Sequence, residues 1–81
     1  MMPQLISATY LRDHIIHVVF DDGMEGDIDF VEELEGEVSA PLNDLQYFKQ
    51  FRVDPEIHTL VWPNGADFAP EFLYEKIKVN V

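Results

Sequence analysis

The sequence predicts one α+β domain over residues 1–81, in which two helices lie on one face of an antiparallel sheet of about five strands, in the order β-β-β-α-β-β-α. Three observations predict this class. Apolar and polar residues alternate in short segments of the first third, two later segments carry apolar residues at helical spacing, and turn residues separate the segments. With 81 residues, of which 47% are hydrophobic, the chain has enough apolar material for one core.

The first third of the chain predicts a meander of three strands joined by tight turns. These strands are expected over residues 5–11, 14–20 and 24–30. In the third strand apolar residues alternate with Glu25, Asp27 and Asp29, so we expect one buried face and one acidic face. Gly23 suits the hairpin turn before it, because glycine accepts a positive φ.

The rest of the chain predicts a helical turn, a helix, two strands and a last helix. These elements are expected over residues 31–36, 43–51, 52–54 and 58–62 and from about residue 70, with residues 37–41 extended. Asn43 is expected to cap the first helix, with Gln46 at capping-box spacing. Pro63 should end the fifth strand, and Pro70 suits the first helical position. If Ala69 is the cap, Phe68 and Leu73 stand at hydrophobic-staple spacing, so they should pack together.

The bulk composition excludes several classes of protein. The formal net charge is −11, with only five Lys and Arg residues, so we expect no direct binding to nucleic acid or to anionic lipid. The absence of cysteine favours a reducing compartment. No segment resembles a signal peptide or a membrane span. We therefore expect a soluble cytoplasmic protein that makes no use of a membrane.

The acidic stretch from Asp21 to Glu37 is the first candidate site. It holds nine carboxylates and no Lys or Arg. Glu25, Asp27 and Asp29 should project together from one strand face, as a ridge that could dock a basic partner, although a solvated face without a partner is the favoured interpretation. The stretch matches a calcium loop in part, but Gly23, at the third position, offers no ligand atom, so a solvated strand face explains it better.

The loop Trp62-Pro63-Asn64-Gly65-Ala66-Asp67 is the second candidate site, since it brings together an aromatic ring, an amide and a carboxylate. The structural interpretation is simpler and is favoured. Trp62 would anchor the core, Gly65 would permit the turn, and Asn64 and Asp67 would bond backbone groups. Trp62, Asn64 and Asp67 remain candidate interaction residues.

Catalytic and metal chemistry have little support in the sequence. No hydroxyl lies in a nucleophile motif and no glycine loop suits a phosphate, so we expect no catalytic residue and no cofactor. His14 and His17 are three apart on an expected strand and point to opposite faces, so they cannot share a metal ion. His58 begins another expected strand. We expect no metal site.

Several short motifs occur in a fixed order along the chain. They are Phe20-Asp21-Asp22-Gly23, Pro41-Leu42-Asn43-Asp44 with Tyr47-Phe48, the 62–67 loop, and Pro70-Glu71 with Leu73-Tyr74. Their order resembles the bacterial family catalogued as domain of unknown function 2442. The resemblance implies a fold but neither an activity nor catalytic residues. It also implies a gene arrangement similar to a toxin–antitoxin pair, with another small protein encoded alongside. Some longer relatives append a helix-turn-helix domain; this chain ends soon after its last expected helix, so direct DNA binding is not implied.

These observations lead to a functional expectation. We expect a small acidic, non-enzymatic protein-interaction module, the antitoxin-like partner of a small basic protein. The alternative is a domain that binds a metal or a small ligand through the acidic strand or the 62–67 loop. An enzyme is the least favoured class, and the sequence does not decide whether the chain forms a homodimer.

Overall fold

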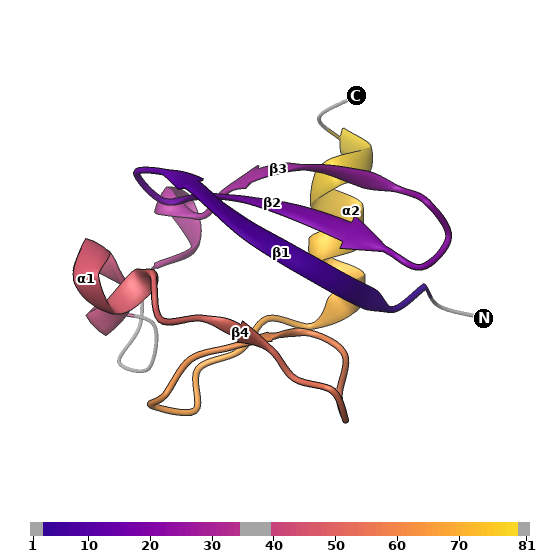
Figure 1. Ribbon diagram of the computed structural model, residues 1–81. Coiled ribbons are helices and arrows are strands. Elements are labelled where there is room, and N and C mark those ends of the chain that lie inside the picture. Colours follow the sequence, from indigo (N-terminus) through magenta and orange to yellow (C-terminus); the bar gives the residue numbers. More distant parts are fainter. Residues whose placement is uncertain (1–2, 35–39, 80–81) are drawn as a thin grey trace.

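Five antiparallel strands in two sheets and two α-helices make up the computed structural model, which describes residues 3–34 and 40–79 (Figure 1). The predicted α+β class and the element order are confirmed. The elements are β1 Leu5–Arg12, β2 Ile15–Phe20, β3 Glu25–Asp29, the 3-10 helices η1 Val31–Glu33 and η2 Ala40–Asn43, α1 Leu45–Phe48, β4 Arg52–Val53, β5 Leu60–Val61 and α2 Pro70–Val79.

The strands divide into a three-stranded sheet, in the order β1-β2-β3, and a separate pair, β4-β5, rather than one continuous sheet. β2 is central in the larger sheet and pairs antiparallel with both neighbours. Asp13 with φ 47° and Gly23 with φ 90° make the two connecting turns. Asp and Gly are among the residues that adopt a positive φ at low energetic cost, so these turns are local consequences of the sequence.

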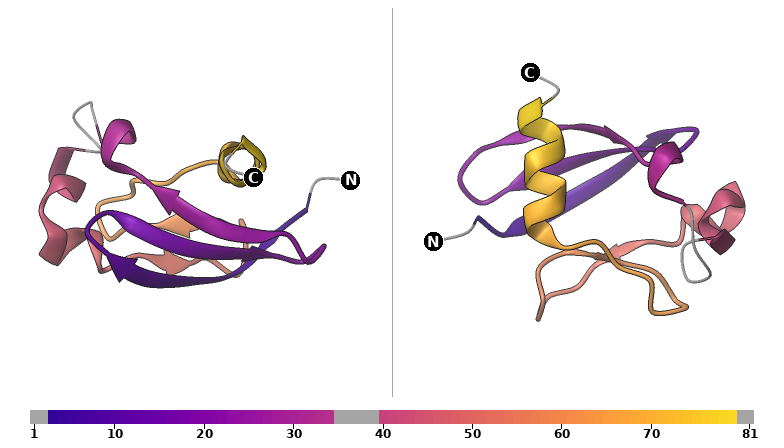
Figure 2. Two further views of the ribbon diagram at one scale, coloured as in Figure 1. Left: turned by 90° about the horizontal axis from the view of Figure 1, so that it is seen from above. Right: turned by 180° about the vertical axis from the view of Figure 1, so that it is seen from behind.

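Opposite faces of the larger sheet have opposite roles. Ile16, Val18 and Ile28 are fully buried on the inner face, against which α2 packs (Figures 1 and 2). Helix and sheet approach each other closely at Gly26, where an added Cβ would lie 3.1 Å from Cγ2 of Ile77. Glycine at this position therefore lets α2 lie directly on β3.

An aromatic cluster joins the second sheet and α1 to the first sheet. The ring of Trp62 lies 5.8 Å from that of Phe48 and 6.4 Å from that of Phe30. The indole N–H of Trp62 donates a hydrogen bond of 2.8 Å to the backbone carbonyl of Phe48. Trp62 is 3% exposed, so this bond satisfies a buried donor that would otherwise be costly.

The start of α1 differs from the prediction. Asp44, not Asn43, is the N-cap, and its carboxylate accepts a 3.0 Å hydrogen bond from the N–H of Gln46. The amide of Asn43 instead donates to the carbonyls of Leu34 and Ala40. The predicted helix was also too long, since α1 ends at Phe48.

Other predicted boundaries also change. The fifth strand is limited to residues 60–61, because His58, with φ 54°, belongs to the turn after Asp54. Residues 40–41, predicted as extended, lie in η2, and residues 37–39 are outside the described residues. The N–H groups of Phe72 and Leu73 donate to the carbonyl of Ala69 at the start of α2.

The N-terminal part of α2 also contacts the aromatic cluster. Phe68 stacks on Phe72, with ring centroids 5.6 Å apart. No helix within residues 3–34 and 40–79 is long and apolar enough to cross a membrane.

Candidate functional site

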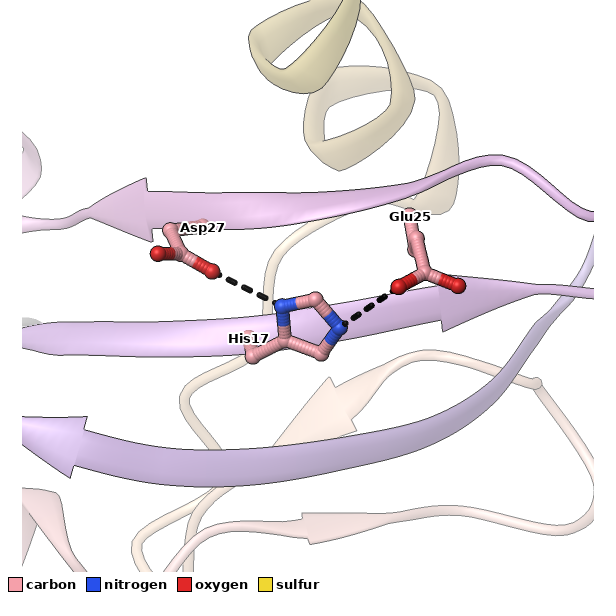
Figure 3. Close-up of polar contacts among 3 residues, drawn as sticks. All are labelled: His17, Glu25 and Asp27. Carbon is pink, nitrogen blue, oxygen red and sulfur yellow. Dashed lines mark hydrogen bonds and ion pairs between the residues drawn. The ribbon is translucent and has the colours of Figure 1, made fainter.

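Glu25, Asp27 and Asp29 lie side by side on β3 with exposed side chains, and we call these three residues the acidic ridge. They alternate with Gly26 and Ile28, which face α2. The ridge therefore lies on the outer face of the sheet, and Figure 3 shows α2 behind the strands from this side. The period of two in the sequence is enough to place these carboxylates together.

His17 on β2 lies between two carboxylates of the ridge (Figure 3). Its Nδ1 is 2.7 Å from Oδ1 of Asp27, and its Nε2 is 3.4 Å from Oε1 of Glu25. The contact follows from the register, which pairs His17 directly with Asp27 across the two strands. The spacing of His14 and His17 in the sequence places them on opposite faces but does not indicate this partnership, which the hairpin register could have indicated.

Both apolar and polar side chains surround the ridge on the outer face of the sheet. Ile15 and Val19 are half-buried and lie on the outer face on either side of His17, and Thr9 of β1 pairs with His17. Among the described residues, each Lys or Arg that forms an ion pair does so with a carboxylate outside the ridge. These pairs are Arg52 with Asp54, Lys76 with Glu33, and Lys78 with Glu75. Within that part of the chain the imidazole of His17 is the only ion-pair partner of the ridge, and Oδ1 of Asp29 accepts a 3.0 Å hydrogen bond from the N–H of Val31.

A shallow hollow of about 180 Å³ lies next to the end of β3. Its lining consists of Asp29, Val31, Glu32 and Lys76. Its volume is below the range of roughly 300–1,000 Å³ that is typical of small-molecule sites. The Nζ of Lys76 is 2.8 Å from Oε1 of Glu33, so the cation beside this hollow already has a partner.

The 62–67 loop is held by its own hydrogen bonds. The N–H of Gly65 donates to the carbonyl of Trp62, and the N–H of Trp62 donates to the carbonyl of Ala66. Oδ1 of Asn64 accepts from the N–H of Ala66, at 3.0 Å, as the structural interpretation predicts for this side chain. Gly65 has φ 90°, which favours glycine.

The candidate residues of the loop divide between core and surface. Trp62 is buried, whereas the side chains of Asn64 and Asp67 are exposed. Asp67 joins the loop to β5 through a backbone bridge with Val61. Figures 1 and 2 show this loop and β3 on opposite sides of β1, so the two candidate sites do not meet.

The histidines point to separate environments. The Nε2 of His14 lies 3.2 Å from the carbonyl oxygens of Leu42 and Asn43, and its ring packs 4.9 Å from that of Phe48. His17 is on the outer face, as expected from the spacing of the two residues. Within residues 3–34 and 40–79, no three His, Asp or Glu side chains are placed to hold a metal ion together.

The turn before β3 is tied to α2 by a hydrogen bond. The hydroxyl of Tyr74 donates to Oδ2 of Asp22, and the N–H of Met24 donates to Oδ1 of the same carboxylate. These two bonds, that of Tyr74 first, hold the pKa of Asp22 below its ordinary value. The same contact raises the pKa of Tyr74. The hairpin that carries the ridge is thus fixed to the helix.

Comparison with known families gives one match. The family model described as "Protein of unknown function (DUF2442)" matches residues 5–79, nearly the whole chain. The chain belongs to the DUF2442 family. The resemblance of the short motifs is confirmed, and both candidate sites of this DUF2442 domain lie inside the matched residues. No curated protein matches the chain, and no solved structure matches it.

Proposed function

We propose that this DUF2442 domain is a small non-enzymatic interaction module that binds a basic protein through the outer face of its three-stranded sheet. The observation that supports this most is the acidic ridge. Three exposed carboxylates, those of Glu25, Asp27 and Asp29, gather on one strand face, and no Lys or Arg of the described residues forms an ion pair with them.

Charge and surface shape both favour a protein as the partner. The net charge of −11 raises the rate of encounter with a cationic surface and opposes approach to phosphate backbones. The half-buried apolar side chains of Ile15 and Val19 beside the ridge offer area that a partner would cover. An open sheet face suits a macromolecule better than a small molecule, since the hollow near Asp29 is shallow. A toxin–antitoxin-like pair is the biological setting that we propose.

Affinity capture with two charge variants tests the proposal. In the ridge variant, Glu25→Gln, Asp27→Asn and Asp29→Asn are combined. The control variant combines Glu56→Gln, Glu71→Gln and Glu75→Gln, which are exposed positions outside the ridge. The two variants have the same net charge, so a difference between them reports position alone.

The expected result is that the tagged wild-type chain, expressed at its native level, retains a basic protein that the control variant also retains. The product of the neighbouring gene is the first protein to look for. The ridge variant should lose that protein, and the complex should weaken as salt concentration rises. Equal retention by the two variants, or recovery of the wild-type chain alone, would contradict the proposal.

A further inference from the structure

The open edge of β3 presents backbone hydrogen-bonding groups. The N–H of Phe30 donates to the carbonyl of His14, at 2.9 Å, and the N–H of Phe20 donates to the carbonyl of Met24, at 2.8 Å. Even-numbered residues of β3 therefore direct their backbone groups toward β2. The N–H and C=O groups of the odd-numbered residues, which are the three residues of the acidic ridge, point away from the sheet. In the part of the chain that the structure describes, no strand pairs with this edge.

The opposite edge of the sheet is different. The pairing of β1 with β2 is irregular at two places, between Leu5 and Ser7 and between Tyr10 and Arg12. Irregular pairing of this kind interrupts the regular row of edge groups and, as a β-bulge does, protects a strand from pairing with another chain. β1 also contacts β4. β3 pairs with β2 in unbroken register from Glu25 to Asp29, so it is the edge that remains suited to pairing.

We propose that the partner adds an antiparallel strand to the edge of β3. This inference rests on the proposed function and specifies how the basic protein binds. In antiparallel addition, the partner residues that hydrogen-bond to Glu25, Asp27 and Asp29 place their side chains on the same outer face as these carboxylates. The edge therefore selects an extended segment with Lys or Arg at every second position. Backbone bonds supply affinity, and the alternating charges set register.

A second copy of this chain does not suit the same edge. Two copies of β3 that pair about Asp27 would place Glu25 opposite Asp29 and Asp27 opposite itself. Like charges directly across a strand pair are destabilising, so the ridge opposes pairing with itself while it favours a cationic strand.

Hydrogen exchange with three synthetic peptides tests the inference on the full chain. The first peptide is a capped seven-residue segment in which Lys alternates with Thr, starting and ending with Lys. In the second peptide the backbone nitrogens of the Lys residues are methylated, which removes the N–H groups that would face β3. In the third peptide the backbone nitrogens of the Thr residues are methylated, which removes the N–H groups that would face away from β3. All three have the same charge.

The first and third peptides are expected to bind and to slow amide exchange at Glu25, Asp27 and Asp29 about tenfold or more, because these N–H groups would become hydrogen-bonded. Gly26 and Ile28, already directed toward β2, should change little. Each N-methyl group on a Lys residue should weaken binding about tenfold, which corresponds to one lost hydrogen bond.

Three outcomes would overturn strand addition. Equal binding of the two methylated peptides, with unchanged exchange at the ridge, would mean that the contact is electrostatic only; strand addition would be rejected, but the proposal of a basic partner would stand. Failure of the unmethylated peptide to bind would also reject strand addition. The capture experiment with charge variants tests the proposed function separately. Exchange at the ridge that slows with protein concentration alone would assign the edge to a second copy.

Discussion

The hydroxyl of Tyr74 in α2 lies 2.5 Å from Oδ2 of Asp22 in the turn between β2 and β3, and it donates a hydrogen bond to that carboxylate. The ring of Tyr74 also packs edge-on against Phe20, with centroids 5.0 Å apart. The hydrogen bond joins residues 52 positions apart, and together with the ring contact it fixes the hairpin against the helix. Its strength should depend on the charge of Asp22.

The first prediction concerns acid stability. Because the folded pKa of Asp22 is lowered, its ionisation stabilises the fold above the ordinary carboxyl pKa of about 4, and this contribution is lost as pH falls through the lower folded value. Asp22→Asn should therefore be less stable than wild type at pH 7, with a smaller loss of stability between about pH 5 and pH 2. Urea unfolding at a series of pH values measures both effects.

A double-mutant cycle supplies the control for this pair. Tyr74→Phe should reproduce part of the effect of Asp22→Asn, and the combined variant should be less destabilised than the sum of the single variants. The raised pKa of Tyr74 predicts a second loss of wild-type stability as pH rises above about 10 through the folded pKa, and Asp22→Asn should reduce that loss. Additive single effects would show that the contact makes no contribution.

The second prediction concerns Trp62. Trp62→Phe keeps an aromatic ring but removes the indole N–H, which leaves the carbonyl of Phe48 without this buried donor and opens a small cavity. The free energy of unfolding should fall by about 2–4 kcal/mol. Circular dichroism is the suitable probe, since the variant lacks the only tryptophan of the chain. Phe51→Leu, at a half-buried ring beside Trp62, should have a smaller effect.

The third prediction concerns the close approach of α2 to β3. In Gly26→Ala the new Cβ would lie 3.1 Å from Cγ2 and 3.2 Å from Cβ of Ile77, so helix and strand must separate slightly. We expect a net loss of about 0.5–2 kcal/mol, because the crowding outweighs the entropic gain of replacing glycine. Ile77→Ala alone should be destabilising, but Gly26→Ala should become less harmful in that background. An unchanged effect of Gly26→Ala there would contradict the assigned contact.

The fourth prediction concerns His17, which competes with a partner for two carboxylates of the ridge. His17→Gln should change stability by less than about 1 kcal/mol, since its ion pairs are solvent-exposed. It should tighten binding of the alternating Lys-Thr peptide about two- to fivefold, because Glu25 and Asp27 lose their internal partner. His58→Asn, remote from the ridge in sequence and in a turn, is the control. Weaker binding by His17→Gln would show that the imidazole supports the interaction.

The sequence predicts the ridge well because strand alternation is a local property. Period two alone places Glu25, Asp27 and Asp29 on one face. The contact of His17 with Asp27 is harder to predict, since it depends on the register across the Asp21–Gly23 turn. A one-residue change of register would place His17 beside different side chains.

Features that depend on competing partners are the least predictable. Asn43 and Asp44 are adjacent and both suit a helix cap, and the choice between them depends on the carbonyls of Leu34 and Ala40, which engage the amide of Asn43. The separation of β4 and β5 from the larger sheet is also hard to predict from the sequence. Strands of two residues carry too little pattern to specify which strand they join.

The unpaired edge of β3 has a consequence for handling the protein. At neutral pH, mutual repulsion of the ridge carboxylates keeps one copy from annealing to the next. Where this repulsion is weakened, the backbone groups of the edge stay available for pairing, so slow assembly into fibres rich in β-structure is expected. Salt should accelerate the same process at neutral pH, because it screens the repulsion.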